Sequence, residues 1–417
     1  MNASVQPAKL SGTIGAIASK SEAHRQLILS SLCQTPTRVI MRGKCDDTEA
    51  TGACLEALGA KIEWDDEGAT VFPDESPVYV NLDARESGST LRFLIPVALA
   101  KCESVSFTGR GRLPERPLTH LIDALKSGGA SFSSDRLPLS AKGKIKSGVY
   151  TVPGNISSQY VTGLLLALPL LNGDSEIRVI GPLQSKAYVD ITLRAMEKFA
   201  LSVQKTETGF FIKGNQTPVS PGTVTVDGDW SNAAFFLAAG AIGNEGVSVS
   251  GLQADAAQGD KKIIALLRAF GAQITENNGT FTVKGGRLHA AEIDIDEVPD
   301  LIAPLAVTAM FAEGKTAFVN GARLRLKESD RIRAMREMIE NMGGQAEETG
   351  DQLIVYGKKP TGGRVNGMND HRIVMAAAIA GAYSENGAVI SHAEAVNKSY
   401  PAFYRDFEKM GGKADVL

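Results

Sequence analysis

The chain has 417 residues, which is too long for one ordinary hydrophobic core, so we expect two large domains. Hydrophobic residues make up 43% and charged residues 22%, a balance typical of globular proteins rather than disordered or membrane-spanning ones. The formal net charge of −3 provides no basic field for nucleic acid or a membrane surface, so any anion site has to be assembled locally.

The four cysteines lie in the first quarter of the chain without paired C-x-x-C spacing, which indicates reduced thiols rather than disulfides or a zinc site. The five histidines form no H-x-x-x-H pair, and we expect neither a metal nor another cofactor. The first ten residues lack the apolar core of a signal peptide, and the longest apolar runs are about half a membrane span. These features predict a cytoplasmic protein.

One pattern recurs along the whole chain: an amphipathic stretch ends in a small residue, and a strand-like segment follows. Glycine is favoured just beyond a helix end because the chain there adopts positive φ. The six endpoints are Gly59, Gly129, Ala200, Gly271, Gly343 and Gly411, so successive intervals are 70, 71, 71, 72 and 68 residues. This near-constant interval predicts six copies of an α/β unit of about 70 residues.

A second kind of helix is expected within the copies, with small and aliphatic residues on every side, as in helices buried all round. These segments are 91–100, 160–171, 233–242, 301–312 and 373–382. Each follows a polar turn rich in Gly, Ser or Asp, and the N–H groups of such a turn favour anions. Since each turn taken singly is better explained as a helix N-cap, the anion-binding interpretation depends on several turns acting together.

The most charged segment is 323–331, Arg-Leu-Arg-Leu-Lys-Glu-Ser-Asp-Arg, directly before an apolar-periodic helix. We expect Ser329 or Asp330 to cap this helix, which places Arg331 in its first turn. Lys327, Glu328 and Arg331 then form a candidate anion site with one carboxylate among its cations; the alternative is a solvated helix start with local ion pairs. Other basic residues near predicted helix starts are Lys20, His24, Arg25, Arg92, Arg112, Arg116, Arg372 and Lys398. A site that gathered them would suit a ligand with two phosphates, or with a phosphate and carboxylates.

Taken together, the motifs resemble those of the 5-enolpyruvylshikimate-3-phosphate synthase family. The matching motifs are Ser19-Lys-Ser-x-x-x-Arg25, Ser87-Gly-Ser-Thr-Leu-Arg92, Glu115-Arg-Pro117, Ser157-Ser-Gln159, Ser185-Lys-x-Tyr188, Pro299-Asp300, Lys327-Glu-Ser-Asp-Arg331, Asn369-Asp-His-Arg372 and Lys398. The resemblance covers essentially the whole chain. Its most specific part is the pair of motifs at 327–331 and 369–372, because no single helix cap explains both.

The resemblance implies an α/β (α+β) fold of two globular domains, each built from three repeated βαβαββ units with buried helices and outer sheets in a pseudo-threefold array. It also implies a discontinuous layout. Residues 14–225 form an N-terminal domain on the shikimate 3-phosphate side, and 1–13 with 226–417 form a C-terminal domain on the phosphoenolpyruvate side. The hinge lies near 12–15 and 226–229.

The implied reaction moves the enolpyruvyl (carboxyvinyl) group of phosphoenolpyruvate to the 5-hydroxyl of shikimate 3-phosphate through a tetrahedral intermediate, with release of phosphate. Such chemistry needs one group to protonate a methylene carbon and another to accept the hydroxyl proton. By resemblance Asp300 accepts that proton, Glu328 protonates the methylene carbon, and Lys20 is a third catalytic residue.

The resemblance also assigns the substrate contacts. For shikimate 3-phosphate they are Lys20, Ser21, Arg25, Ser157, Ser158, Gln159, Ser185, Tyr188, Asp300 and Lys327. For phosphoenolpyruvate they are Lys20, Gly88, Arg116, Gln159, Arg331, Arg372 and Lys398. The implied protein is a monomer in aromatic amino acid biosynthesis whose partners are its two substrates, without nucleic acid or membrane. Its domains are expected to close on shikimate 3-phosphate, and the inhibitor glyphosate is expected to bind together with that substrate.

Two positions depart from the family pattern. Members usually carry Asn-x-Gly-Thr ahead of the arginine at 92, where this chain has Glu86-Ser-Gly-Ser89. The added negative charge of Glu86 is expected to turn away from the phosphate pocket or to pair with Arg85 or another cation. Arg323 stands where some members place a substrate-binding Asn, and we assign it no role.

Three functions other than this enolpyruvyl transfer are less compatible with the sequence. The related enolpyruvyl transferase acting on UDP-N-acetylglucosamine carries a cysteine five residues before an Arg-Pro, but here that position is Gly111 and no cysteine follows Cys102. An RNA-end-binding protein on similar repeats would need a basic surface and exposed aromatics, whereas aromatics are only 6% here. A non-catalytic sugar-phosphate sensor would have no need of Asp300 and Glu328.

Overall fold

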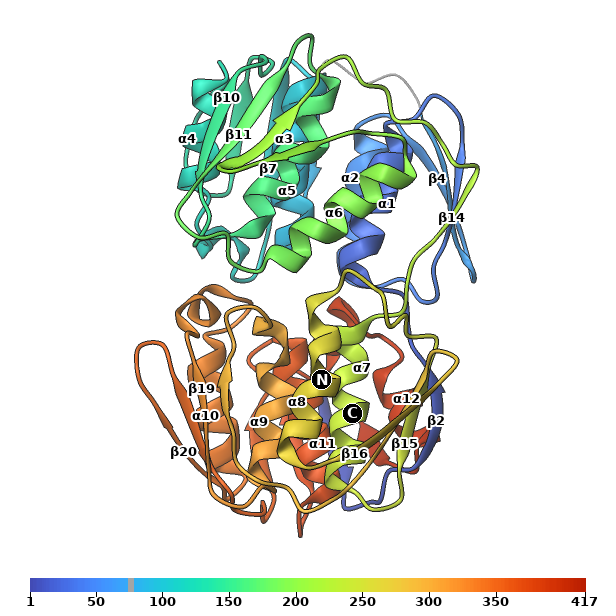
Figure 1. Cartoon of the computed structure of the whole chain (residues 1–417), viewed down its shortest axis with the longest axis vertical. Coiled ribbons are helices and arrows are strands. Elements are labelled where there is room, and N and C mark those ends of the chain that lie inside the picture. Colours follow the sequence, from blue (N-terminus) through green and yellow to red (C-terminus); the bar gives the residue numbers. More distant parts are fainter. Residues whose placement is uncertain (74–78) are drawn as a thin grey trace. The chain divides into compact units, whose positions relative to one another are not determined.

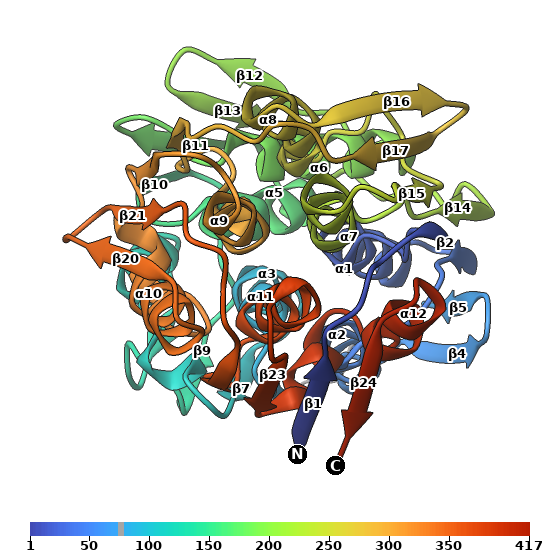
Figure 2. The same ribbon diagram turned by 90° about the horizontal axis from the view of Figure 1, so that it is seen from below.

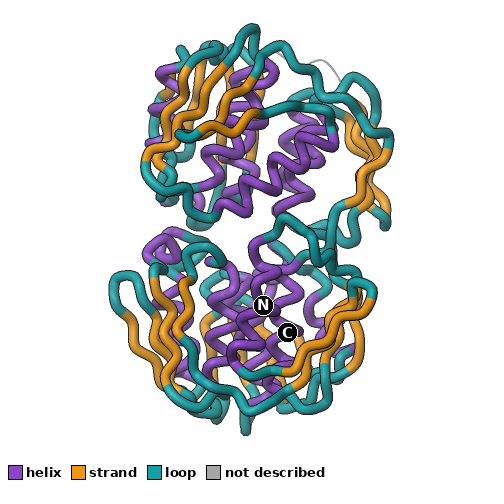
Figure 3. Tube along the Cα trace, viewed as in Figure 1, coloured by secondary structure: helices purple, strands orange, loops and turns teal. Residues whose placement is uncertain are grey.

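The computed structural model describes residues 1–73 and 79–417, and the chain divides into two compact units. Unit 1 comprises Met1–Ser19 with Asp227–Leu417, and unit 2 comprises Lys20–Val226. Within each unit the strands lie on the outside and the long helices lie beneath them (Figure 1). The same separation into outer strands and inner helices is visible when the chain is coloured by secondary structure (Figure 3).

The elements of unit 2 alternate between helices and short strands. They are α1 (Lys20–Ser31), β3 (Thr37–Ile40), α2 (Asp46–Ala57), β4 (Lys61–Asp65), β5 (Gly68–Phe72), β6 (Tyr79–Asp83), α3 (Gly88–Lys101), β7 (Ser104–Thr108), η1 (Leu113–Glu115), α4 (Thr119–Ser127), β8 (Ser131–Phe132), β9 (Leu139–Lys142), β10 (Val149–Pro153), α5 (Ser158–Ala167), η2 (Leu168–Leu170), β11 (Ser175–Ile180), α6 (Lys186–Lys198), β12 (Gln204–Thr206), β13 (Gly209–Ile212) and β14 (Thr223–Thr225).

Unit 1 repeats this alternation. Its elements are β1 (Asn2–Gln6), β2 (Gly12–Gly15), α7 (Trp230–Ile242), β15 (Val247–Ser250), η3 (Gly259–Lys262), α8 (Ile263–Phe270), β16 (Gln273–Asn277), β17 (Thr280–Lys284), β18 (Glu292–Asp294), η4 (Pro299–Leu301), α9 (Ile302–Met310), β19 (Lys315–Val319), η5 (Ala322–Leu326), α10 (Arg331–Asn341), β20 (Gln345–Glu348), β21 (Leu353–Tyr356), β22 (Gly363–Asn366), α11 (His371–Tyr383), β23 (Ala388–Ser391), η6 (Ala393–Lys398), α12 (Phe403–Lys409) and β24 (Lys413–Val416).

The described strands form six four-stranded sheets. In the sheet ordered β6-β7-β9-β8, the first pair is parallel and the other two pairs are antiparallel. A parallel pair needs a crossover connection, and α3 provides it between β6 and β7. A second helix, α4, follows β7, so the copy reads βαβαββ. These mixed sheets confirm the predicted fold class.

Strands from the start of the chain complete two sheets of unit 1. The strand β1 pairs antiparallel with β23 and β24, and β2 pairs parallel with β15. In unit 2 the strand β14, at the end of that segment, pairs parallel with β3. The first copy of each unit is therefore closed by a strand from a distant part of the sequence.

The apolar helices lie in the interior of their units, as their composition predicted. In unit 1 the helices α7, α9 and α11 pack on one another, and Figure 2 shows them end-on with strands of that unit around them. In unit 2 the helices α3 and α5 pack closely, since a Cβ atom at Gly163 would lie 2.3 Å from the carbonyl oxygen of Arg92.

All six repeat endpoints adopt positive φ, from 58° at Ala200 to 106° at Gly271. The sequence interval therefore marks a backbone conformation that recurs in every copy. Ala200 accepts it despite its Cβ atom, which costs about 1–2 kcal/mol in this region.

We expect Gly129→Ala to lower the free energy of unfolding by about 1 kcal/mol, because φ is +103° there while no atom lies within 4 Å of the new Cβ. The effect then comes from the backbone alone. Gly350→Ala is the matched control, since Gly350 also has open space but no positive φ, and it should be neutral or slightly stabilising. Urea unfolding followed by circular dichroism measures both, and equal effects would contradict the prediction.

Candidate active site

The centre of the site in unit 1 is Arg331, whose side chain is 1% exposed and contacts three carboxylates. Its Nη1 lies 2.7 Å from Asp300 Oδ1, its Nη2 lies 2.5 Å from Glu328 Oε2, and its Nε lies 2.9 Å from Asp370 Oδ2. The planar guanidinium is suited to this because its five N–H donors have fixed directions. Asp330 caps α10 by accepting from the Arg333 backbone N–H, which puts Arg331 in the first helical turn as predicted.

Asp300 lies near three cationic side chains. Besides Arg331, its carboxylate is 3.0 Å from Arg372 Nη2 and 3.9 Å from Lys327 Nζ. Burial raises the pKa of Asp300, but Arg372, Lys327 and Arg331 more than offset this and hold the pKa well below its usual value. Asp300 is therefore ionised near neutral pH.

Asp370 is a buried partner of Arg331 that the sequence motifs did not single out. It is 0% exposed, caps α11 through the backbone N–H of Arg372, and accepts a hydrogen bond of 2.8 Å from the Ser329 hydroxyl. Burial raises the pKa of Asp370, and Arg331 lowers it to a net value below the usual one. An aspartate two residues before the arginine of Asn-Asp-His-Arg, directly ahead of an apolar helix, was the available signal, because Asp is a strong N-cap.

Lys398 and Arg323 complete the cationic surroundings of unit 1. Lys398 is buried in η6 and donates to the Asn369 carbonyl oxygen at 2.6 Å, so it belongs to the same turn as Arg372. Arg323 pairs with Asp296 at 2.7 Å and also donates to its carbonyl. Lys398 thus lies with the predicted site residues, while Arg323, which is part of η5, is paired with Asp296.

In unit 2 the residues predicted near the start of α1 lie together with a carboxylate. Lys20 Nζ is 2.8 Å from Asp47 Oδ2 on α2. Arg25 is 2% exposed, and it donates to Thr192 Oγ1 at 2.7 Å and to the carbonyl oxygens of Tyr188 and Ser21. Burial lowers the pKa of the Arg25 guanidinium. Arg25 therefore connects α1 to α6 through the Thr192 hydroxyl and the Tyr188 backbone carbonyl.

The turn before α3 brings two more arginines together. Ser87 caps α3, and a Cβ atom at Gly88 would lie 2.6 Å from Arg116 Nη1 and 2.7 Å from Arg92 Nη1. A larger residue at this helix start would force the guanidinium groups of both arginines to shift. Gln159 on α5 joins the group, since its amide nitrogen donates to Ser89 Oγ at 3.0 Å and its oxygen accepts from Arg92 at 3.3 Å.

The predicted serines also open helices of unit 2. Ser157 caps α5 by accepting from the Gln159 backbone N–H, and Ser158 begins the helix. Ser185 precedes α6 in a left-handed conformation with φ of 52°, and Tyr188 lies in the first turn of α6. These helix starts present N–H groups of the kind that bind phosphate.

Glu86 lies against Gly111, where a Cβ atom would come 2.4 Å from Glu86 Oε2. Arg85, one of its expected partners, instead pairs with Glu49 at 3.4 Å. The extra carboxylate is thus directed toward the loop that carries Arg112 and Arg116.

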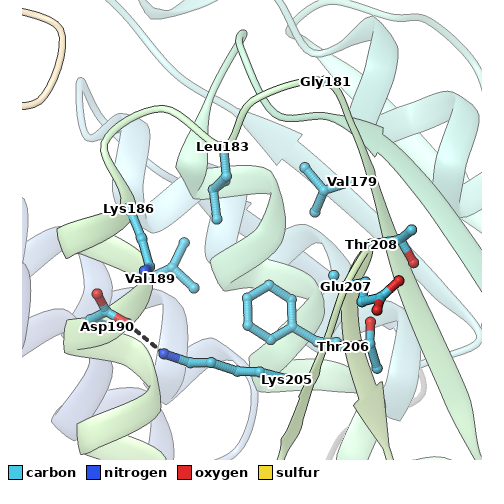
Figure 4. A pocket seen from close by; sticks show the side chains of 12 residues that line it. Val179, Gly181, Leu183, Lys186, Val189, Asp190, Lys205, Thr206, Glu207 and Thr208 are labelled. Carbon is cyan, nitrogen blue, oxygen red and sulfur yellow. Dashed lines mark hydrogen bonds and ion pairs between the residues drawn. The ribbon is translucent and has the colours of Figure 1, made fainter.

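A separate cavity of about 280 Å³ lies in unit 2 between α6 and the β12–β13 hairpin (Figure 4). Val179, Leu183, Val189 and Phe210 line it, and Lys205 pairs with Asp190 at 3.0 Å at its edge. It contains none of the residues predicted to bind substrate or to act in catalysis.

Among the described residues, no group of three or more His, Cys, Asp or Glu side chains is placed to hold a metal ion. Over the same part of the chain, every helix is too short or too polar to cross a membrane. The four cysteines are free thiols.

The fold is that of the enolpyruvyl transferases. The structure aligns with EPSP synthase from Acinetobacter baumannii at a TM-score of 0.83 and 24% identity, with 100% of both chains covered. It aligns with the enolpyruvyl transferase NikO from Streptomyces tendae at a TM-score of 0.79 and 16% identity, over 99% of this chain and 98% of NikO.

The sequence comparisons are more specific. The family model described as EPSP synthase (3-phosphoshikimate 1-carboxyvinyltransferase) matches residues 5–407. A 3-phosphoshikimate 1-carboxyvinyltransferase from Clostridium kluyveri is 41% identical over 99% of this chain and 98% of its own length, and one from Clostridioides difficile is 37% identical with the same coverage. The chain belongs to the EPSP synthase family.

Proposed function

We propose that this chain transfers the carboxyvinyl group of phosphoenolpyruvate to the 5-hydroxyl of shikimate 3-phosphate, releasing phosphate, and that Asp300 and Glu328 carry the two proton transfers. The observation that supports these roles most directly is the guanidinium of Arg331, which contacts both carboxylates, at 2.7 Å and 2.5 Å. Addition and elimination each need one proton given and one taken, and two carboxylates in one cationic site can meet both needs.

Asp300 becomes a stronger base when substrate anions bind. Arg372, Lys327 and Arg331 hold its pKa low. A phosphate or carboxylate group bound to the same cations partly neutralises their positive charge. The burial of Asp300 then raises the pKa of Asp300. The proton of the 5-hydroxyl can therefore pass to Asp300 when both substrates are in place.

The remaining residues hold the substrates. We propose that unit 1 binds phosphoenolpyruvate through Arg331, Arg372 and Lys398, with Lys327 and Asp300 reaching shikimate 3-phosphate. We propose that unit 2 supplies the other contacts, which are Lys20, Ser21, Arg25, Gly88, Arg116, Ser157, Ser158, Gln159, Ser185 and Tyr188. The capped helix starts of unit 2 support a phosphate-binding role for the serines among these residues. The protein is a monomer in the cytoplasm and needs no cofactor.

The direct test is release of inorganic phosphate from phosphoenolpyruvate, with and without shikimate 3-phosphate. We expect release only when both are present, together with a new enolpyruvyl ether detected by mass spectrometry. UDP-N-acetylglucosamine in place of shikimate 3-phosphate should give no release. Binding of shikimate 3-phosphate without any turnover would support the sensor alternative and overturn the proposal.

The two substrates should bind cooperatively, because the residues proposed to hold them are divided between both units. We expect shikimate 3-phosphate to tighten the binding of phosphoenolpyruvate or of glyphosate by about 5–150-fold, the usual range for coupled sites. Calorimetric titration of glyphosate with and without saturating shikimate 3-phosphate measures this. The reverse titration must give the same factor, and equal affinities in the two titrations of glyphosate would contradict the prediction.

A further inference from the structure

Four polar side chains form a buried hydrogen-bonded chain across α1, α2 and α3 of unit 2, and the proposed function gives none of them a role. They are His24, Thr51, Thr90 and Ser87, and each is at most 1% exposed. His24 Nδ1 lies 2.7 Å from Thr51 Oγ1, which lies 2.7 Å from Thr90 Oγ1. Thr90 Oγ1 is in turn 2.7 Å from Ser87 Oγ. A buried polar network whose members are hydrogen-bonded to one another holds the elements that carry them in one arrangement.

This chain of hydrogen bonds has a direction, because each hydroxyl group has only one hydrogen to donate. The Thr90 hydroxyl donates to Ser87 Oγ, and the Asp47 carbonyl oxygen lies 3.3 Å from it as a second acceptor. Thr90 therefore accepts from Thr51, and Thr51 accepts from the Nδ1–H of His24. The reverse direction would place the histidine proton on Nε2, which has no hydrogen-bond partner among the described residues.

His24 is a neutral ring in this arrangement. Burial lowers the pKa of His24 well below its usual value, and the positive charges of Lys20 and Arg25 lower it further. A second proton would also create an N–H at Nε2 without an acceptor. The ring therefore keeps a single N–H group, and the start of the chain is fixed.

The chain ends at the start of α3. Ser87 is the N-cap of this helix and accepts a hydrogen bond from the Thr90 backbone N–H at 3.2 Å as well as from its hydroxyl. The next residue, Gly88, is a proposed contact of phosphoenolpyruvate. A Cβ atom at Gly88 would lie within 2.7 Å of guanidinium nitrogens of both Arg92 and Arg116. Because the two arginines approach so closely, a small shift of this helix start would change the space between Gly88 and their guanidinium groups.

We infer that His24 is a positioning residue for phosphoenolpyruvate, which acts through Thr51 and Thr90 to hold Gly88 at the start of α3. This inference rests on the proposed function, in which Gly88 contacts phosphoenolpyruvate. His24 itself contacts no substrate. The proposed contacts of shikimate 3-phosphate in unit 2 come instead from the starts of α1, α5 and α6, so loss of the chain should weaken the binding of one substrate more than that of the other.

Thr51→Val breaks the chain at its middle, on a helix that carries none of the proposed substrate contacts. Valine has the shape of threonine but no hydroxyl group. We expect the KM for phosphoenolpyruvate to rise about tenfold, the scale of one lost buried hydrogen bond, while the dissociation constant for shikimate 3-phosphate stays within about twofold of wild type. Thr37→Val is the matched control, because Thr37 is also buried in unit 2 and its hydroxyl donates to Ser220 Oγ at 2.7 Å. Both constants should keep their wild-type values in this control.

His24→Asn and His24→Leu separate hydrogen bonding from packing, and they keep the test open if Thr51→Val fails to fold. The amide nitrogen of asparagine can take the place of Nδ1 and donate to Thr51, although the smaller side chain leaves a void. Leucine fills the space but cannot donate. We expect the KM for phosphoenolpyruvate to be lower in His24→Asn than in His24→Leu, the opposite of the order that packing alone predicts.

NMR of nitrogen-labelled histidine side chains provides a readout that does not depend on activity. The signal of His24 is identified by its loss in His24→Leu, and it should show the Nδ1–H tautomer. The inference alone is overturned by an Nε2–H tautomer, by equal KM values for phosphoenolpyruvate in the two threonine variants, or by a KM in His24→Asn no lower than in His24→Leu. An inactive wild type overturns the proposed function and the inference with it.

Discussion

Glu328→Gln should lower turnover by about 10²–10⁴-fold while both substrates still bind. The amide has the shape of the carboxyl group and keeps an oxygen that can accept the Arg331 hydrogen bond, which is 2.5 Å long in the wild type. It has no acidic proton to give to the methylene carbon of phosphoenolpyruvate. The loss should therefore appear in kcat, and the dissociation constant for shikimate 3-phosphate should change little.

Glu337→Gln is the matched control for this variant. Glu337 lies on α10, is 24% exposed against 23% for Glu328, and is also paired with an arginine, Arg333, at 2.7 Å. It should retain wild-type turnover because it lies outside the cluster around Arg331. Steady-state phosphate release and calorimetry on the three proteins separate catalysis from binding. If turnover of Glu328→Gln stays within about threefold of wild type, Glu328 is not the proton donor.

Features that depend on neighbouring residues could be predicted from the sequence. The positive φ at the repeat endpoints and the helix cap at Asp330 can each be recognised from a short sequence pattern, and the structure confirms both. Ala200 shows how the interval helped, since alanine alone gives no reason to expect φ of 58°. The same holds for the buried helices, whose apolar composition predicted their place inside each unit.

The carboxylate partners of the cations could not be predicted in the same way. The motifs gathered Arg331, Arg372 and Lys20 as candidate anion ligands, yet two of these cations are paired with carboxylates, Arg331 with Asp370 and Lys20 with Asp47. Asp370 is 39 residues from Arg331 in the sequence, and Asp47 is 27 from Lys20. Only the packing of separate helices brings such pairs together, and each aspartate is indistinguishable in sequence from an ordinary helix cap.

Burial was the second property that the sequence did not reveal. Arg25 was expected to contact shikimate 3-phosphate, and its proposed role now has to include hydrogen bonds to Thr192 and the Tyr188 carbonyl, more than 160 residues away. Asp370 shows the same limit, because its lowered pKa depends on the charge of Arg331, which opposes the effect of burial. Titration behaviour follows from three-dimensional surroundings rather than from residue type.

Arg331→Met should lower the free energy of unfolding of unit 1 by about 3–5 kcal/mol at neutral pH and abolish activity. Methionine fills much of the space but leaves Asp300, Glu328 and Asp370 without their shared guanidinium. Carboxylates that lose their counter-ion in a buried site are strongly destabilising, although Arg372 and Lys327 remain beside Asp300. Arg333→Met is the control, since Arg333 lies on the same helix but is 65% exposed and should cost no more than about 1 kcal/mol.

The cost of Arg331→Met should also depend on pH, in a direction that follows from the carboxylates. In the wild type the pKa values of Asp300 and Asp370 are lowered, so the stability they contribute is present above the unfolded value of about 3.9 and is lost as pH falls through their lower folded values. Removal of Arg331 raises both folded pKa values. The variant can then relieve its unpaired charges by protonation as the solution becomes more acidic, and the difference between the two proteins should shrink from pH 7.5 to pH 4.5.

Urea unfolding at these two pH values measures the effect, with tryptophan fluorescence as the probe for unit 1. The chain has two tryptophans, of which Trp230 is buried in unit 1 and Trp64 belongs to unit 2. A Trp64→Phe background therefore restricts the signal to Trp230. We expect a large difference between Arg331→Met and its parent at pH 7.5, a smaller one at pH 4.5, and almost none for Arg333→Met at either pH. A difference of the same size at both pH values would mean that lost packing, rather than unpaired charge, destabilises the variant, and Arg331 would then not be the electrostatic centre of unit 1.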